Sequence, residues 1–274
     1  MRYSTQKDYG KPIRLHDAEH VEQMRIAGRI AADTLDYIAP FVKPGISTAE
    51  LDSLCDAFMR AAGSIPATID YHGYKHASCI SVNHVVTHGV PSPTKILKAG
   101  DIVNIDVTPK IDGNWHGDTS RTFKVGEVSI LARRLVDVAY QAMMAGVALV
   151  RPGATLGDIG AEIDAVVRAA RFSSVRDFCG HGVGQIFHDT PQVVHQGKRG
   201  TGIVLEPGMF FTIEPMVNAG GYEVKVLGDK WTTVTKDHSL SAQFEHTVAV
   251  TDDGVEIFTL SAAERAQRSA ATAP

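Results

Sequence analysis

The chain repeats part of its own sequence at an offset of 108 residues, and this repeat constrains the fold more than any other feature. The match runs without a gap from residue 44 to residue 106. The matching segments include Pro44-Gly45 with Pro152-Gly153, Val85-Val86 with Val193-Val194, Leu97-Lys98-Ala99-Gly100 with Leu205-Glu206-Pro207-Gly208, and Asn104-Ile105-Asp106 with Thr212-Ile213-Glu214. Clefts form where two similar halves of a protein meet. We therefore expect Asp106 and Glu214 to face each other across a cleft.

Both copies contain helix patterns followed by strand patterns. Apolar residues at helical spacing predict helices over residues 17–39, 48–62, 130–149 and 156–170. Alternation predicts strands over residues 78–83, 102–110, 115–125, 209–217, 231–235 and 241–251. The turn sequence Ile111-Asp112-Gly113-Asn114 should join two of these strands in a hairpin. Helices and antiparallel strands alternate twice, which predicts an internally duplicated α+β fold with pseudo-two-fold symmetry and helices on one side of a curved antiparallel sheet.

The length of 274 residues fits one large domain or two fused halves. No linker rich in Pro, Gly and Ser separates the copies, so we expect them to pack as one unit. The sequence predicts an N-terminal arm over residues 1–12, a single domain over 13–260 with halves at about 40–150 and 151–260, and a frayed tail over 261–274.

Composition excludes several classes of protein. A net charge of −4 provides no basic field for nucleic acid. No window approaches 18 consecutive apolar residues, and residues 1–20 lack the apolar core of a secretion signal, so we expect no membrane partner. Three widely spaced cysteines do not form a disulfide framework, which predicts a cytoplasmic location. No exposed apolar stripe requires a second subunit, which favours a monomer.

Strand alternation places single acids on polar faces. Asp106, Glu214 and Glu245 each lie on the polar side of an otherwise apolar predicted strand. Asp118 lies on the return strand of the hairpin that begins with Asp106. His181 lies in Cys179-Gly180-His181-Gly182-Val183-Gly184, whose glycines allow close approach of the backbone to a ligand.

Four carboxylates and one imidazole form a plausible dinuclear metal site. Paired carboxylates in a cleft repel unless a proton or a metal intervenes. Their combined charge of about −4 would offset two divalent cations and leave room for a bridging hydroxide. Oxygen and nitrogen ligands favour Mn, Fe, Co, Zn or Mg. Any one of these acids alone is more often a solvated strand residue, and the duplicated position is what argues for a site.

The other histidines are weaker candidates by chemistry alone. His88 and His188 are more often packing or surface residues in such contexts. His116 and His246 neighbour acids of the set, but a step of one residue along a strand points them to the opposite face. No phosphate-binding loop, HExxH zinc helix or Gly-x-Ser-x-Gly elbow is present, which argues against nucleotide-binding, zincin and serine-hydrolase classes.

The chain resembles type I methionine aminopeptidases of the pita-bread metallopeptidase family over residues 13–260. The motifs that carry the resemblance are Tyr71-His72-Gly73-Tyr74, Asn104-Ile105-Asp106-Val107-Thr108, His116-Gly117-Asp118-Thr119, Cys179-Gly180-His181-Gly182, Phe211-Thr212-Ile213-Glu214-Pro215-Met216 and Ser239-Leu240-Ser241-Ala242-Gln243-Phe244-Glu245-His246-Thr247. The resemblance implies a pita-bread fold with two divalent metal ions. It also implies removal of the initiator methionine from nascent proteins and peptides with a small second residue, by metal-activated water attack, with transient ribosome contact as a further expectation.

The same resemblance implies roles for individual residues. Asp118 and Glu245 would bridge the metals, Asp106 would complete one metal site, and His181 with Glu214 would complete the other. His88 would contact the scissile amide nitrogen or the next backbone group, His188 the carbonyl oxygen, and Glu214 would pass a proton to the leaving amine. The substrate pocket would be lined by Tyr71, Tyr74, Cys79, Thr108, Phe187, Met216, Trp231 and Gln243, which ordinary core packing would also explain.

One spacing and two positions depart from the family pattern. The spacing between Asp106 and Asp118 is one residue longer than is common, so we expect a longer or bulged hairpin with an unchanged ligand pair. Thr68 stands where cysteine is common and Asp70 where glycine is common, at the rim of the pocket. Two alternative functions remain: a proline-specific aminopeptidase, whose members normally carry an extra N-terminal domain, and a non-catalytic pita-bread protein that has lost metal ligands.

Overall fold

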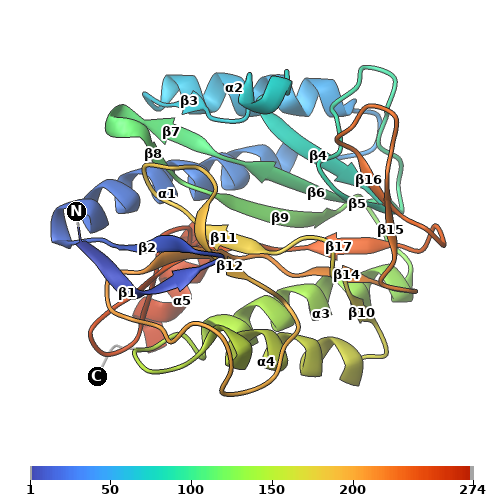
Figure 1. The fold of residues 1–274 in the computed structure, drawn as a ribbon. Coiled ribbons are helices and arrows are strands. Elements are labelled where there is room, and N and C mark those ends of the chain that lie inside the picture. The colour runs from blue at the N-terminus through green and yellow to red at the C-terminus, as the bar shows by residue number, and fades with distance from the viewer. Residues whose placement is uncertain (1, 272–274) are drawn as a thin grey trace.

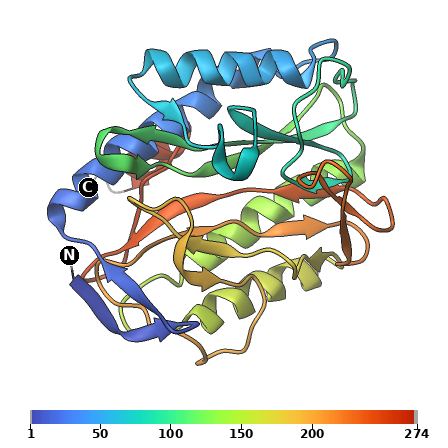
Figure 2. The ribbon, with the colours of Figure 1, turned by 45° about the horizontal axis from the view of Figure 1, so that its top comes forward.

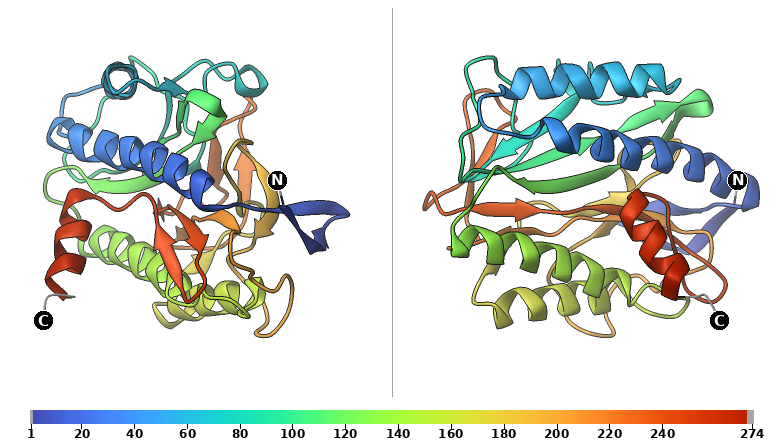
Figure 3. Two further views of the ribbon diagram at one scale, coloured as in Figure 1. Left: turned by 90° about the vertical axis from the view of Figure 1, so that its left-hand side faces the viewer. Right: turned by 180° about the vertical axis from the view of Figure 1, so that it is seen from behind.

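The computed structural model describes residues 2–271 and shows two halves stacked on each other (Figure 1). The first half carries α1 (Ala18–Ile38) and α2 (Thr48–Ala61), and the second carries α3 (Ile130–Val147) and α4 (Leu156–Ala169). Viewed from behind, these helices and the C-terminal α5 (Ala262–Ala271) lie in front of the strands (Figure 3, right). The helices therefore cover one side of the sheets, as predicted for this α+β fold.

Within the described residues, antiparallel pairing joins the strands into six small sheets. The two that carry most of the candidate site have the orders β4 (Ser78–Val82)–β6 (Ile102–Val107)–β9 (Thr119–Lys124) and β12 (Asp189–Val193)–β11 (Gly180–Gly182)–β13 (Phe210–Ile213)–β18 (His246–Val250)–β19 (Val255–Ile257). The others are β10 (Ser173–Ser174)–β14 (Met216–Asn218)–β17 (Ser241–Gln243), β15 (Val224–Val226)–β16 (Thr233–Thr235)–β5 (Val85–Thr87), β3 (Ile65–Pro66)–β7 (Pro109–Ile111)–β8 (Trp115–His116), and β1 (Arg2–Asp8)–β2 (Lys11–Leu15). Short 3-10 helices are η1 (Ala39–Phe41), η2 (Tyr71–Gly73) and η3 (Asp112–Asn114). A bridge between Ser120 and Glu245 connects the halves.

The duplication in the sequence is also present in the structure. Helices α2 and α4 begin with matching capping boxes, Ser47 with Glu50 and Thr155 with Asp158. The isolated bridges Ser47–Ile96 and Thr155–Val204 are related by the same offset of 108 residues as the sequence repeat. Gly100 and Gly208 occupy equivalent left-handed turns, with φ of 96° and 94°. The two copies therefore have similar backbone conformations as well as similar sequences.

Strand alternation sorts the apolar side chains away from the acids. Ile105 on β6 packs in a core with Leu35 and Leu51 of the first half. Ile213 on β13 packs with Leu135 of α3 in the core of the second half. The neighbouring acids Asp106 and Glu214 consequently lie on the opposite faces of their strands, towards the junction of the halves.

Four helices begin and end within two residues of their predicted bounds, but four predicted strands are interrupted. The strand predicted over 102–110 divides into β6 and β7 at Thr108, and the one over 115–125 divides into β8 and β9 at Gly117-Asp118. The strand predicted over 209–217 divides into β13 and β14 at Glu214-Pro215, and the one over 241–251 divides into β17 and β18 at Phe244-Glu245. Three of these breaks lie at candidate ligands, namely Asp118, Glu214 and Glu245. The strand predicted over 231–235 begins only at Thr233.

Both chain ends are more structured than predicted. The prediction of a frayed tail is wrong for residues 261–271, because α5 begins with a capping interaction between Ser261 and Glu264. Residues 272–274 lie outside the described part of the chain. The expected N-terminal arm is a hairpin that continues to Leu15, past the predicted boundary at residue 12, and lies beside the second half (Figure 2).

The hairpin between Asp106 and Asp118 is regular, so of the two expected alternatives, a longer or a bulged hairpin, the bulge is excluded. Val107 pairs with Thr119 and Lys110 with His116, so one register holds along both parts of the hairpin. The chain reverses in η3 at the end of the hairpin. The pairing keeps Asp118 opposite Thr108, whose hydroxyl donates to the Asp118 carboxylate at 2.8 Å.

Candidate metal centre

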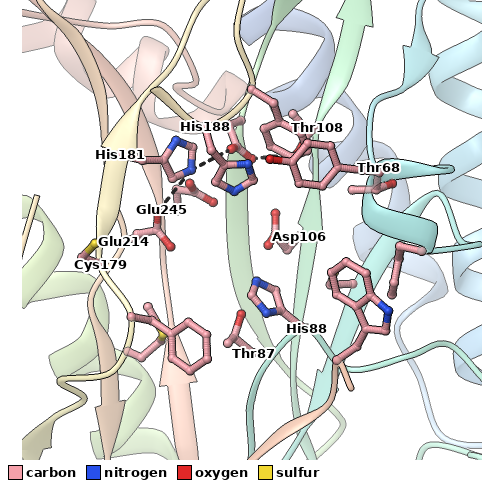
Figure 4. A pocket seen from close by; sticks show the side chains of 18 of the residues that line it. Thr68, Thr87, His88, Asp106, Thr108, Cys179, His181, His188, Glu214 and Glu245 are labelled. Atoms are coloured by element: carbon pink, nitrogen blue, oxygen red, sulfur yellow. Dashed lines mark hydrogen bonds and ion pairs between the residues drawn. The ribbon is translucent and has the colours of Figure 1, made fainter. Parts of the chain in front are cut away.

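A cavity of about 300 Å³ lies where the two halves meet. Figure 4 shows polar side chains converging on it, with His181, Glu214 and Glu245 near one another and Asp106 facing them. The residues that line it are Thr68, Tyr71, Tyr74, Cys79, Thr87, His88, Asp106, Thr108, Asp118, Asp177, Phe178, Cys179, His181, Phe187, His188, Glu214, Met216, Trp231 and Glu245. All five predicted metal ligands are among them.

Each candidate ligand comes from a different place in the fold. Asp106 lies inside β6 and His181 inside β11, Asp118 lies just before β9, and Glu214 and Glu245 lie at the breaks in their strands. Ligand atoms of Asp118, His181 and Glu245 all lie within 4.8 Å of one another. Nε2 of His181 is 3.5 Å from Oδ2 of Asp118 and 3.7 Å from Oε1 of Glu214. These atoms are close enough to bind the same metal ion, and they come from both halves of the chain.

Neighbouring polar groups fix the orientation of the acids. Thr108 donates to Asp118 at 2.8 Å and Thr212 donates to Glu214 at 2.7 Å. Nδ1 of His181 lies 3.0 Å from the carbonyl oxygen of Gly182, which leaves Nε2 directed at the acids. Such hydrogen bonds hold ligand side chains in one orientation before a metal binds.

The electrostatics of the centre fit a pair of cations. Burial and the neighbouring carboxylates raise the pKa of Asp106 and of Glu245 well above the usual range. Burial, opposed by His181, raises the pKa of Glu214 to about 7. For His181, burial acts to lower the pKa, but Asp118 and Glu214 outweigh it and raise the pKa to about 9. In the metal-free site these side chains therefore bind protons, which reduce the repulsion among the carboxylates. Divalent cations can replace those protons, because the donor atoms are oxygen and nitrogen.

His88 and His188 line the same cavity outside the acid cluster. Burial lowers the pKa of His88 to about 4. Partial removal from water and the nearby His181 lower the pKa of His188. The His188 ring lies 4.2 Å from the ring of His181 and stacks on Tyr71 at 5.2 Å. Both imidazoles are therefore neutral near pH 7 and close to the candidate ligands.

Aromatic and sulfur-containing side chains form the rest of the wall. Tyr74 donates its hydroxyl to the carbonyl of Ser78 at 2.9 Å, and its ring meets the Trp231 ring edge-on at 4.9 Å. Seven of the eight predicted pocket residues line the cavity. Gln243 does not, and instead donates to the Glu214 carboxylate at 3.2 Å. Its assignment to the substrate pocket is thus corrected to a contact with a candidate ligand.

The two unusual rim residues have distinct positions. Thr68 lines the cavity and donates to the carbonyl oxygen of His76 at 2.8 Å. Asp70 has φ of 65°, a left-handed conformation that glycine adopts without strain, and it forms an ion pair with Lys75.

The sequence missed Thr87, Asp177 and Phe178 as lining residues, and placed Cys179 only in a motif. Each lies one to four residues from His88 or His181, and that proximity was the only available signal. His116 and His246 lie outside the lining, as their strand parity predicted. His116 instead contacts the carbonyl oxygen of Gly184 through Nδ1 at 2.7 Å.

Known proteins with similar sequences and structures share this arrangement of elements. The sequence matches metallopeptidase family M24 over residues 22–252. Methionine aminopeptidase of Rickettsia prowazekii is 52% identical over 250 residues, which are 91% of this chain and 96% of that protein. Methionine aminopeptidase of Escherichia coli strain K12 is 51% identical, with 90% of this chain and 94% of that protein covered. The crystal structure of the Rickettsia prowazekii enzyme superposes with a TM-score of 0.89 over 90% of this chain and all of that one.

The fold and the centre define a metal-dependent hydrolase with a pita-bread fold, and the chain belongs to metallopeptidase family M24. Within that family it belongs with the methionine aminopeptidases. No helix in residues 2–271 is both long and apolar enough to cross a membrane.

Proposed function

We propose that the chain removes the N-terminal methionine from polypeptides whose second residue is small, by attack of water within a dinuclear metal centre. The observation that carries this proposal is the convergence of Asp106, Asp118, His181, Glu214 and Glu245 on one cavity beside a pocket of aromatic and sulfur-containing side chains. Identity of 52% over 96% of a methionine aminopeptidase supports the same activity. It also favours this substrate over the proline-specific alternative.

The five donor residues would hold two divalent cations. Asp118 and Glu245 would contact both of them, Asp106 would help to hold one, and His181 with Glu214 would help to hold the other. None of the five is missing, which disfavours a non-catalytic protein. Bound divalent cations polarise a carbonyl group and lower the pKa of a coordinated water.

Three side chains then handle protons and developing charge. Glu214 accepts a proton from water and passes it to the leaving amine. Neutral His188 donates a hydrogen bond to the scissile carbonyl oxygen as negative charge develops there. Neutral His88 contacts the scissile amide nitrogen or the next backbone group.

The methionine side chain occupies the apolar part of the cavity. Tyr74, Phe187 and Trp231 present ring surfaces there, and Cys79 and Met216 present sulfur. A flexible thioether makes favourable contacts with such surfaces. Selection of a small second residue follows when the space beyond the scissile bond is restricted by the metal centre and the two histidines.

We further propose that the substrates are nascent chains met in transient contact with the ribosome, and that the enzyme acts as a monomer in the cytoplasm. All three cysteines are free, which supports a reducing compartment. Light scattering of the purified enzyme tests the monomer, and cosedimentation with ribosomes tests the contact.

Peptide cleavage tests the central proposal. Met-Ala-Tyr should be cleaved far faster than Met-Arg-Tyr, with Leu-Ala-Tyr as a control for the methionine pocket, across Mn, Fe, Co, Zn and Mg. Asp106→Asn should abolish cleavage with little loss of fold, because it removes a ligand charge and relieves repulsion among carboxylates. Wild-type turnover by Asp106→Asn at saturating metal would remove the ligand assignment, and equal cleavage of the two methionyl peptides would remove the size selectivity.

A further inference from the structure

The segment that follows His188 is irregular where it borders the metal centre. Strand β12 is the edge of its sheet and pairs with β11. His181 pairs with Gln192, but the next residue, Gly182, pairs with Asp189, so the register shifts between them. Pairing with β11 alone therefore does not fix the chain between His188 and Gln192.

The N-terminal hairpin fastens this irregular segment. Three hydrogen bonds of 2.7 Å connect them: Nε of Arg14 to Oδ2 of Asp189, Oγ1 of Thr190 to the carbonyl of Pro12, and N–H of Gln192 to Oδ2 of Asp8. The other oxygen of Asp189 accepts from the backbone N–H of Thr190 at 2.9 Å. Asp189 thus joins the hairpin to the first turn of the irregular segment.

The hairpin is itself anchored elsewhere on the second half. Gln6 and Val204 exchange two hydrogen bonds of 2.8 Å, and the N–H of His16 donates to the carbonyl of Gly208 at 2.7 Å. Residues 204–208 lead into β13, which ends at Ile213, the neighbour of the candidate ligand Glu214. The hairpin therefore connects two separate parts of the second half and provides a fixed base for Arg14.

We propose that Arg14 is a positioning residue that holds His188 in place through Asp189. The side chains of Arg14 and Asp189 are only 24% and 19% exposed, so removing Arg14 leaves a partly buried carboxylate without its counter-charge. Asp189 then moves towards water and takes the adjoining His188 with it. This inference rests on the proposed role of His188 in stabilising charge on the scissile carbonyl.

Kinetics of matched variants test the proposal. Arg14→Ala should lower kcat roughly tenfold with little change in KM, because displacement of a group that acts in the transition state reduces turnover. Metal content should stay at the wild-type level. Arg14→Lys should recover most of the loss, since an ammonium can replace a single hydrogen bond. Arg25→Ala is the control, because Arg25 forms an ion pair with Glu256 at 2.5 Å on another part of the surface.

Two further measurements separate this inference from the proposed function. Hydrogen exchange in Arg14→Ala should accelerate in residues 183–193 and stay unchanged in α3, whatever the role of His188. In a His188→Ala background, Arg14→Ala should cause no further loss of kcat. Unchanged exchange in 183–193, or a loss of kcat in Arg25→Ala equal to that in Arg14→Ala, would overturn the positioning role. Normal turnover by His188→Ala would instead overturn the proposed function of His188.

Discussion

Nε2 of His195 accepts a hydrogen bond from the backbone N–H of Glu214 at 3.2 Å. The ladder of β13 ends at Ile213, so this N–H needs another acceptor. His195 is 1% exposed, and burial lowers its pKa to about 3, which keeps the imidazole neutral. Because Nε2 is the acceptor, the ring proton lies on Nδ1. A buried histidine outside the cavity therefore helps to place a candidate metal ligand.

Replacement of His195 should weaken the metal site that contains Glu214. His195→Leu removes the acceptor and should weaken metal affinity by roughly 10- to 100-fold, as loss of outer contacts to ligands generally does. His195→Gln can place an amide oxygen near the same N–H and should retain more affinity. Titration calorimetry with Mn measures both variants, and equal affinity in His195→Leu and the wild type would contradict the role.

Removal of metal should make stability depend on pH. The pKa values of Asp106, Glu214 and Glu245 are raised in the folded protein, so the metal-free fold retains protons that the unfolded chain releases. Stability of the metal-free protein should then fall as pH rises from about 4.5 through about 7, because folding resists ionisation of these groups. Bound cations should offset this loss.

Thermal unfolding with and without a chelator measures that difference. The gap in Tm between loaded and metal-free protein should widen by roughly 5 °C from pH 5 to pH 8. Metal-free Asp106→Asn should be more stable than the metal-free wild type at pH 8 and should gain less from added metal. A gap that stays constant with pH would show that the carboxylates are not the groups involved.

Gly117 allows α1 to approach the hairpin beside Asp118. A Cβ atom at Gly117 would lie 2.2 Å from the carbonyl oxygen of Ala27. Gly117→Ala should therefore force the two backbones apart, lower the free energy of unfolding by about 1–3 kcal/mol and weaken metal binding through Asp118. Gly228→Ala is a matched control, since a Cβ there meets nothing within 4 Å. Similar denaturant midpoints for the two variants would contradict this packing argument.

Glu264 attaches α5 to the body of the protein. It accepts from the Tyr140 hydroxyl at 2.8 Å and lies 3.5 Å from Nε2 of His246. Burial alone would raise the pKa of Glu264, but His246 and Ser261 outweigh burial and hold the pKa well below the usual range. A carboxyl group with a lowered pKa stabilises the fold above its unfolded pKa and loses that effect as pH falls.

Glu264→Gln should lower the free energy of unfolding by about 1–3 kcal/mol at pH 7. The difference from the wild type should shrink as pH falls below about 4.5, because Glu264 takes up a proton there in the unfolded chain while the folded protein keeps the carboxylate charged to lower pH. Urea unfolding at several pH values measures this, with the exposed Glu127→Gln as control. A difference that does not change with pH would show that charge on Glu264 is not the source.

The sequence predicted what depends on local periodicity. Helix bounds followed from spacing and capping residues, and alternation placed Asp106 and Glu214 on the faces they occupy. The helix α5 was missed because alanine is its only apolar residue type, and residues such as Asp33 and Tyr140 that contact it are distant in the chain. Asp177 and Phe178 were missed because no repeating pattern marks a loop that enters a cavity.

The duplicated fold divides the candidate ligands between its halves. Asp106 and Asp118 come from the first half, and His181, Glu214 and Glu245 come from the second. Neither half alone supplies a complete donor set, so a chain still being synthesised remains inactive until the segment containing Glu245 has folded against the earlier half. Activity should therefore appear in one step at the end of folding. A partly folded molecule would have no proteolytic activity with which to damage its neighbours.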